Sequence, residues 1–170
     1  MEARLIYPEF FHTYISKVDT GISPIDLLEE GLRATLLSFK FLSSEKENYR
    51  YAPEKWSVKE VLGHIIDTEI IMAYRALCIS RGEKASLPGF DEQQYVINSN
   101  FANQKIGDLL EHYKMVRFSN ILLFKGFTEE MFTRKGISNG NEINTRALSY
   151  IIAGHEVHHI GILKERYGVK

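Results

Sequence analysis

The sequence contains almost no cysteine, which limits what can hold the chain together. Cys78 is the one cysteine among 170 residues, so no internal disulfide can form. This usage fits a reducing compartment, and we expect a cytoplasmic protein. Cys78 falls inside a predicted helix, where a small core residue is a simpler interpretation than a nucleophile.

The chain also lacks long uncharged apolar runs and blocks of positive charge. No apolar stretch approaches the ~20 residues that span a bilayer, and the first residues lack the apolar core of a signal peptide. The net charge is −1, from 21 basic and 22 acidic residues without a basic cluster. Because nucleic acid is bound through clustered Lys and Arg, we expect neither nucleic acid nor membrane as a partner. A small-molecule substrate remains.

The sequence has a strong helical periodicity of apolar residues. Apolar residues recur every three or four positions in four long segments, which the pattern predicts to be helices. These segments cover about residues 24–44, 58–80, 104–125 and 145–167. Ser23 and Pro24 are typical of a helix start, and Ser57 followed by Glu60 predicts a capping box. The pattern predicts an all-α fold of the four-helix-bundle type.

The segments between these helices differ in length. Residues 82–103 form a long crossover in which a short helix over about 92–97 is expected, and residues 126–144 are polar enough for a short hairpin or loop. We expect a single domain over residues 1–170. Its bundle core would cover about 24–168, preceded by an N-terminal extension, 1–23, to which the sequence assigns no role.

Two histidines near the end of the chain stand at a spacing that suits a metal ion. His155 and His159 are four residues apart, so on a helix they lie on the same face. His64 lies on or beside the apolar face of the second predicted helix, which a bundle can bring to this pair. Three neutral imidazoles with an open position make a catalytic type of metal site. The alternative is a pair of partly buried histidines that are hydrogen-bonded to their neighbours, with His64 a core residue whose hydrogen bonds are satisfied.

The same segment also contains the pattern His-Glu-x-x-His of zinc proteases, in which Glu156 would be the general base. That interpretation needs a third ligand downstream. Glu165 stands where the third histidine of the extended protease motif would be. We therefore expect any third ligand to come from upstream, and Glu156 to turn away from the pair.

Other polar residues near the histidines have weaker claims. His158 lies about a quarter-turn from His159 on a helix, which favours a place on the surface or behind the ligands. Asp67 or Glu69 could orient a ligating imidazole through its second nitrogen, and the alternative for each is a solvated carboxylate. His12 and His112 belong to no pattern, and no role is assigned to them.

Two segments together resemble one known family. The sequence WSVKEVLGHIIDTE at 56–69 is similar to the opening of that family's second helix, and IIAGHEVHHIGIL at 151–163 is similar to its closing Gly-His-x-x-His-His motif. The chain is identified on these residues as a member of the DinB/YfiT-like superfamily of four-helix-bundle proteins. The likeness covers about residues 24–168.

The resemblance implies a divalent metal, nickel or zinc, held by His64, His155 and His159 with water. It also implies a bundle in the order up-down-down-up and a homodimer. The activities it implies are those of a thiol-dependent S-transferase, which uses a low-molecular-weight thiol, or of a hydrolase, and it assigns no catalytic residue besides the ligands. The alternative is a non-catalytic, stress-related protein whose metal holds the bundle together, because a fold does not fix a reaction.

Overall fold

Four long helices carry the fold in the computed structural model, which describes residues 4–170. They are α2 (Pro24–Phe39), α4 (Val58–Ser80), α6 (Ile106–Lys125) and α8 (Thr145–Tyr167). The shorter elements are η1 (Glu9–Phe11), α1 (His12–Ile15), α3 (Ser44–Glu47), α5 (Glu92–Ile97), η2 (Phe101–Asn103), α7 (Glu129–Thr133), β1 (Lys135–Ser138) and β2 (Asn141–Asn144). The predicted all-α, four-helix class is confirmed, with a two-stranded hairpin between α7 and α8.

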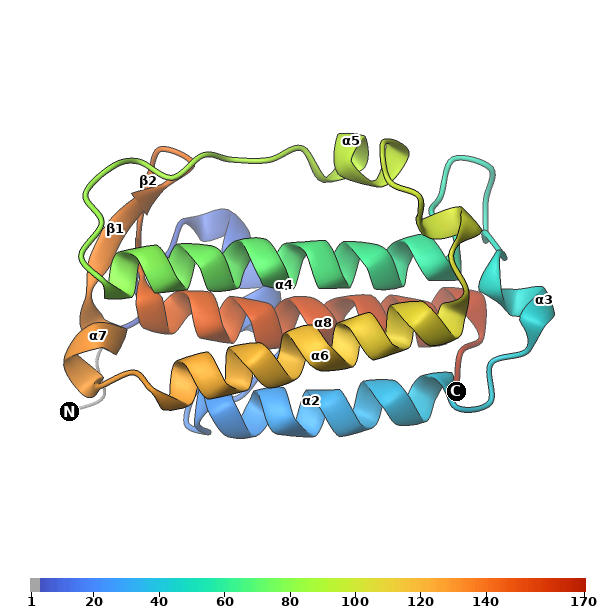
Figure 1. The fold of residues 1–170 in the computed structure, drawn as a ribbon, viewed down its shortest axis with the longest axis horizontal. Coiled ribbons are helices and arrows are strands. Elements are labelled where there is room, and N and C mark those ends of the chain that lie inside the picture. Colours follow the sequence, from blue (N-terminus) through green and yellow to red (C-terminus); the bar gives the residue numbers. More distant parts are fainter. Residues whose placement is uncertain (1–3) are drawn as a thin grey trace.

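The four helices form one bundle in which each contacts two neighbours. Helix α4 packs against α6 and α8, and α2 packs against the same two helices from the opposite side. In Figure 1, α2 and α8 run from left to right while α4 and α6 run from right to left. The long crossover at 81–105 joins the parallel helices α4 and α6 and carries α5 along the outside of the bundle. No helix in residues 4–170 is both long and apolar enough to cross a membrane.

Side-chain caps set where the two site-bearing helices begin. At the start of α4 the Ser57 hydroxyl accepts a hydrogen bond from the Glu60 amide at 3.3 Å, and the Glu60 carboxylate accepts one from the Ser57 amide at 2.6 Å. This is the predicted capping box. Asn144 caps α8 by accepting from the Ala147 amide at 3.0 Å. The helix ends at Tyr167 and is followed by Gly168, whose φ of +67° is left-handed and suits glycine.

The first long helix is shorter than the sequence predicted. Its periodicity extends to about Ser44, but α2 ends at Phe39. The Leu42 amide donates to the Phe39 carbonyl in a tight turn, and Leu42 packs against the core. Phe41 consequently points to solvent and is 71% exposed. The chain then forms α3, whose Lys46 donates to the Gly168 carbonyl at the end of α8.

The N-terminal extension packs against α8. Helix α1 contacts α8 along its length, and a Cβ at position 154 would collide with the Tyr14 carbonyl oxygen. Gly154 therefore permits a close approach of the two backbones. Tyr14 is thereby placed beside the histidines of α8.

Candidate metal centre

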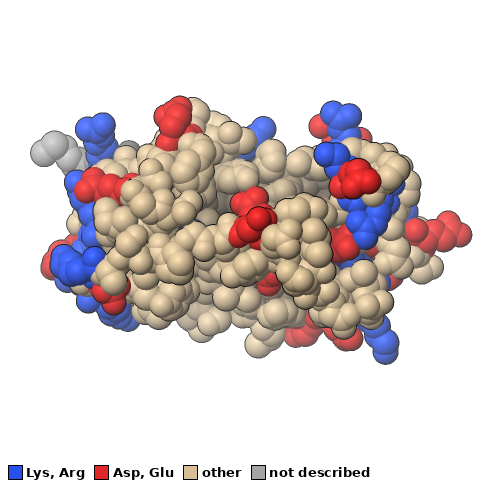
Figure 2. Space-filling view, turned by 90° about the horizontal axis from the view of Figure 1, so that it is seen from above, with Lys and Arg blue, Asp and Glu red and all other residues tan. Residues whose placement is uncertain are grey.

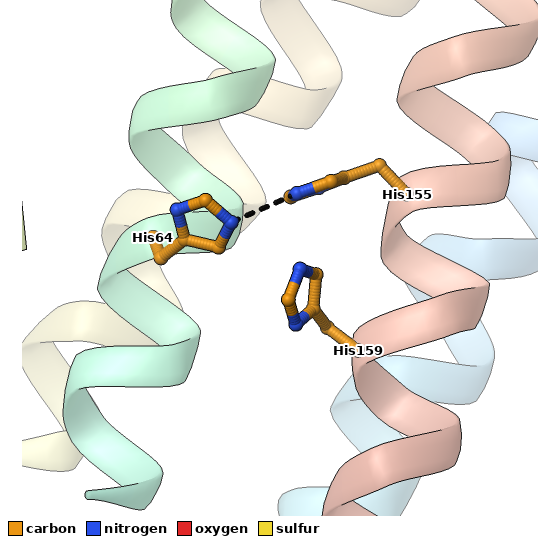
Figure 3. A group of neighbouring side chains, drawn as sticks. All are labelled: His64, His155 and His159. Atoms are coloured by element: carbon orange, nitrogen blue, oxygen red, sulfur yellow. Dashed lines mark hydrogen bonds between the residues drawn. The ribbon is translucent and has the colours of Figure 1, made fainter. Parts of the chain in front are cut away.

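Helices α4 and α8 lie side by side and bring three histidines together. His64 comes from the second turn of α4, and His155 and His159 come from successive turns of α8. Figure 3 shows the three rings converging in the space between the two helices. The nearest pair of nitrogens, Nε2 of His64 and Nε2 of His155, is 2.9 Å apart. One nitrogen of each ring can be chosen so that all three lie within 4.8 Å of one another.

The His64 ring is held between neighbours that aim its Nε2 at the cluster. Its Nδ1 lies 3.5 Å from the hydroxyl oxygen of Thr68, one turn further along α4. The Trp56 ring covers it with a centroid distance of 4.7 Å. A Cβ at Gly63 would collide with the Phe101 ring, so close packing also fixes this turn of α4.

All three imidazoles are neutral at physiological pH because the protein removes them from water. Burial lowers the pKa of His64 to about 4 and that of His159 to about 3, with the neighbouring histidines adding to the effect. The pKa of His155 lies well below its usual range for the same two reasons. The neutral imidazole is the form that binds a metal.

These residues fit a divalent metal ion. The Nε2 atom of His159 is buried, and it has no hydrogen-bond partner within residues 4–170. Leaving a buried polar atom without a partner costs about 1–3 kcal/mol, and a bound ion would supply the missing partner. Imidazole suits zinc and nickel among the common metals. The donor set of the cluster therefore suits a divalent metal.

Glu156 does not face the histidines. Its carboxylate accepts hydrogen bonds from Thr35, Tyr113 and Arg117 in the opposite part of the core. It therefore cannot act as the general base of a zinc-protease motif. The residue that lies with His155 and His159 is His64, which precedes them in the chain.

The suggestion that Glu69 orients a ligating imidazole is wrong. Both Glu69 carboxylate oxygens accept hydrogen bonds from Arg117, and Oε1 also accepts one from Asn120. The side chain near the second nitrogen of His64 is Thr68 instead. No hydrogen bond joins Asp67 to the three histidines in the part of the chain that the structure describes.

A pocket of about 220 Å³ opens beside His159. Trp56 forms part of its wall and is fixed from two sides: its indole N–H donates to Gln93 of α5 at 3.0 Å, and its carbonyl accepts from the Tyr167 hydroxyl at 2.7 Å. Tyr51 and Ile162 also line the pocket. A small molecule in this pocket would contact the exposed side of the cluster.

Two further residues lie near the cluster: Tyr14, which was not predicted from the sequence, and His158, which was expected on the surface or behind the ligands. The Tyr14 ring meets His155 edge-on at 5.0 Å and His158 at 5.4 Å. His158 is half-buried behind His159, with ring centroids 5.0 Å apart, and lies outside the group whose nitrogens converge. Nothing in the local sequence indicates the place of Tyr14, because it depends on how the extension packs.

Comparisons with known proteins identify the family of the chain and a solved structure of the same fold. The family model of the DinB superfamily matches residues 27–163. A protein of Oceanobacillus iheyensis named "Putative metal-dependent hydrolase OB0413" is 23% identical over 124 residues, covering 72% of this chain and 71% of its own. YfiT from Bacillus subtilis, described as a probable metal-dependent hydrolase with an unusual four-helix bundle topology, has the same fold, with a TM-score of 0.73 at 18% identity. The alignment covers 90% of this chain and 91% of YfiT. The chain belongs to the DinB superfamily.

Proposed function

We propose that the protein is a metal-dependent enzyme of the hydrolase type, in which His64, His155 and His159 hold one divalent ion. The observation that carries this proposal is the convergence of three neutral imidazoles beside an open pocket, one of them with an unpartnered nitrogen. The names of the two relatives support it. A bound divalent ion with an open position lowers the pKa of a water or thiol that it binds, and so supplies a nucleophile near neutral pH.

The residues of the chain would hold and shield this site. Trp56 covers one face of His64, and Tyr14 packs against the edge of His155, so bulk water is kept from these two rings. His159 is the histidine that reaches the wall of the 220 Å³ pocket. A substrate would therefore approach from the side of His159, between the residues that precede α4 and the end of α8.

The test is turnover by the full chain after loading with zinc or nickel. Chromogenic ester and amide substrates would be assayed for hydrolysis, and a thiol with an electrophilic acceptor would be assayed for S-transfer. We expect metal-dependent hydrolysis that His155→Ala abolishes, while His158→Ala, a change at a neighbouring histidine outside the cluster, retains it. Turnover in metal-free His155→Ala protein would contradict the proposal.

Two other outcomes would redirect it. Metal-dependent S-transfer without hydrolysis would assign the thiol as nucleophile. A protein that binds metal and gains thermal stability from it, yet turns over no substrate, would be the non-catalytic metal-binding protein, since metal binding contributes to folding free energy.

A further inference from the structure

A second pocket lies on the other side of the histidine cluster from the first. It has a volume of about 260 Å³, and Tyr14, whose ring contacts that of His155, forms part of its wall. Helix α5 contributes to both pockets, with Gln93 in the first and Glu92 in the second. Figure 2 shows the face that carries α5: Lys and Arg gather at its two ends, and acidic side chains lie near its middle beside a hollow.

The second pocket contains a buried arginine without an acidic partner. Arg75 of α4 is 4% exposed, lines this pocket, and forms no ion pair within residues 4–170. Its guanidinium donates to the Pro88 carbonyl at 2.6 Å and to the Met72 sulfur at 3.5 Å, and it lies over the Phe90 ring. A guanidinium has five N–H donors, so others remain. A buried charge without a counter-charge is costly, which points to an anionic ligand.

The other buried arginine at this depth provides a comparison. Arg117 is fully buried as well, but two carboxylates, Glu69 and Glu156, compensate its charge. Arg75 has no such acidic partner within residues 4–170, and it lines a pocket.

The same pocket carries one opposite charge at a different place on its wall. Glu92 lines it too, and no ion pair joins Glu92 to Arg75. Glu92 is exposed at the rim, and partial loss of water around its carboxylate raises its pKa, with the nearby Asp91 raising it further. A cationic group in the pocket would relieve both effects. Two opposite charges that face one space without pairing match a ligand that carries both signs.

The remaining wall is largely aromatic. Phe10, Phe11 and Phe90 line the pocket together with Met72. Ligand pockets typically have volumes of about 300–1,000 Å³, so 260 Å³ suits a small group. Arg75 is eleven residues beyond His64 on α4, roughly 16 Å along the axis. Its side chain leans back toward the helix N-terminus, and Tyr14, on the wall of the same pocket, contacts the His155 ring.

We propose that the pocket formed by Arg75, Glu92, Tyr14 and the three phenylalanines, here named the Arg75 pocket, binds an amino-acid-type group. Arg75 would bind its carboxylate, Glu92 its ammonium group, and the aromatic rings its apolar part. Binding to the Arg75 pocket does not depend on the proposed metal-dependent function.

The experiment compares three probes that share one apolar part. L-Phenylalanine has both charges, 3-phenylpropanoate has only the carboxylate, and 2-phenylethylamine has only the ammonium group. Each is titrated by calorimetry into the zinc-loaded full chain and, in parallel, into the metal-free chain. We expect L-phenylalanine to bind about tenfold or more tightly than either analogue, since each charge contact contributes.

Substitutions then assign the contacts. Glu92→Gln should weaken L-phenylalanine about tenfold and leave 3-phenylpropanoate unchanged, because only the ammonium contact is lost. Arg75→Lys, which retains the charge but loses the planar fork, should weaken both acids. Glu54→Gln serves as the matched control, because Glu54 lines the pocket on the other side of the cluster. Glu92 lies at the surface, so its replacement tests the proposal even if Arg75 variants fold poorly.

The proposal is overturned if none of the probes binds at about 10 mM. It is also overturned if L-phenylalanine binds only the zinc-loaded protein and both substitutions leave that binding intact, since the amino acid would then be chelating the metal. Zinc content measured on the same samples separates the two proposals. Zinc uptake without probe binding would contradict the proposed Arg75 pocket. Probe binding without zinc uptake would contradict the proposed metal centre.

Discussion

Arg117 donates a hydrogen bond to Glu156 at 2.8 Å in the centre of the bundle, where neither side chain is more than 2% exposed. The same guanidinium donates to both oxygens of Glu69 on α4 and to the Leu28 carbonyl on α2. One side chain of α6 therefore connects the other three long helices. Two of these, α4 and α8, carry the histidines, so the ion-pair network fixes their relative positions.

Replacing Arg117 with Met should destabilise the protein by about 3–5 kcal/mol, because removal of one partner leaves two buried carboxylates without their counter-charge. Urea unfolding followed by circular dichroism measures this change. Lys125→Met is the control, because Lys125 also lies on α6 and pairs with an acid of α2, Glu29, but at an exposed position. It should change stability little. Equal losses in the two variants would contradict the role of the network.

Gly31→Ala should also destabilise the protein, although alanine has a higher helix propensity than glycine. A Cβ at this position in α2 would collide with the Glu156 carboxylate and lie 3.1 Å from Arg117, and overpacking costs about 1–3 kcal/mol. Gly161→Ala in α8 has free space around its Cβ and should stabilise by about 0.5–1 kcal/mol. Thermal unfolding of both variants checks the prediction, and a stabilised Gly31→Ala protein would refute it.

The stability of the metal-free protein should decline below about pH 6.5. The pKa of His64 is about 4 and that of His159 about 3 in the folded chain, against about 6.5 in the unfolded chain. Between these values the unfolded state binds protons that the folded state does not, so the free energy of unfolding decreases as the pH decreases. The stability that the neutral, buried imidazoles contribute is fully present above pH 6.5. It is lost as the pH falls toward the pKa values that these imidazoles have in the folded chain.

Urea midpoints of the chelator-treated protein at pH 7 and pH 5 measure this slope. His159→Gln should reduce the difference between the two midpoints, whereas replacement of the exposed His12 should leave it unchanged. A slope that is the same in the wild type and His159→Gln would show that the buried imidazoles are not its source.

Trp56 should report metal binding directly. It is the one tryptophan of the sequence, and its ring centroid lies 4.7 Å from that of His64. Titration with nickel or cobalt should therefore quench the fluorescence in the wild type and leave it nearly unchanged in His155→Ala. Equal quenching in both proteins would mean that the ion binds elsewhere.

Much of the fold follows from local sequence. The start of α4 at Ser57 and of α8 at Asn144 depends on caps within three residues, and the helical spacing of His155 and His159 places both on one face. The pairing of His64 with them needed only that two amphipathic helices pack. Because these features depend on residues that are close together in the chain, they can be predicted from the sequence.

The remaining features depend on contacts between distant segments. The position of Tyr14 beside His155 arises from the packing of α1 on α8, and the burial of Glu69 arises from Arg117, 48 residues later. From the sequence alone we interpreted Glu69 as a solvated or ligand-orienting carboxylate, because its partner Arg117 lies on another helix. The homodimer and the thiol cosubstrate remain predictions.

The measurement that tests the central claim most directly is the metal content of untagged protein by plasma mass spectrometry. The wild type is compared with His64→Ala, His155→Ala and, as the matched control, His158→Ala. The account predicts about one divalent ion per chain in the wild type and His158→Ala, and loss of the ion in the two cluster variants. Absence of metal from the wild type even after incubation with excess zinc and nickel, or its retention in His64→Ala and His155→Ala, would contradict the account.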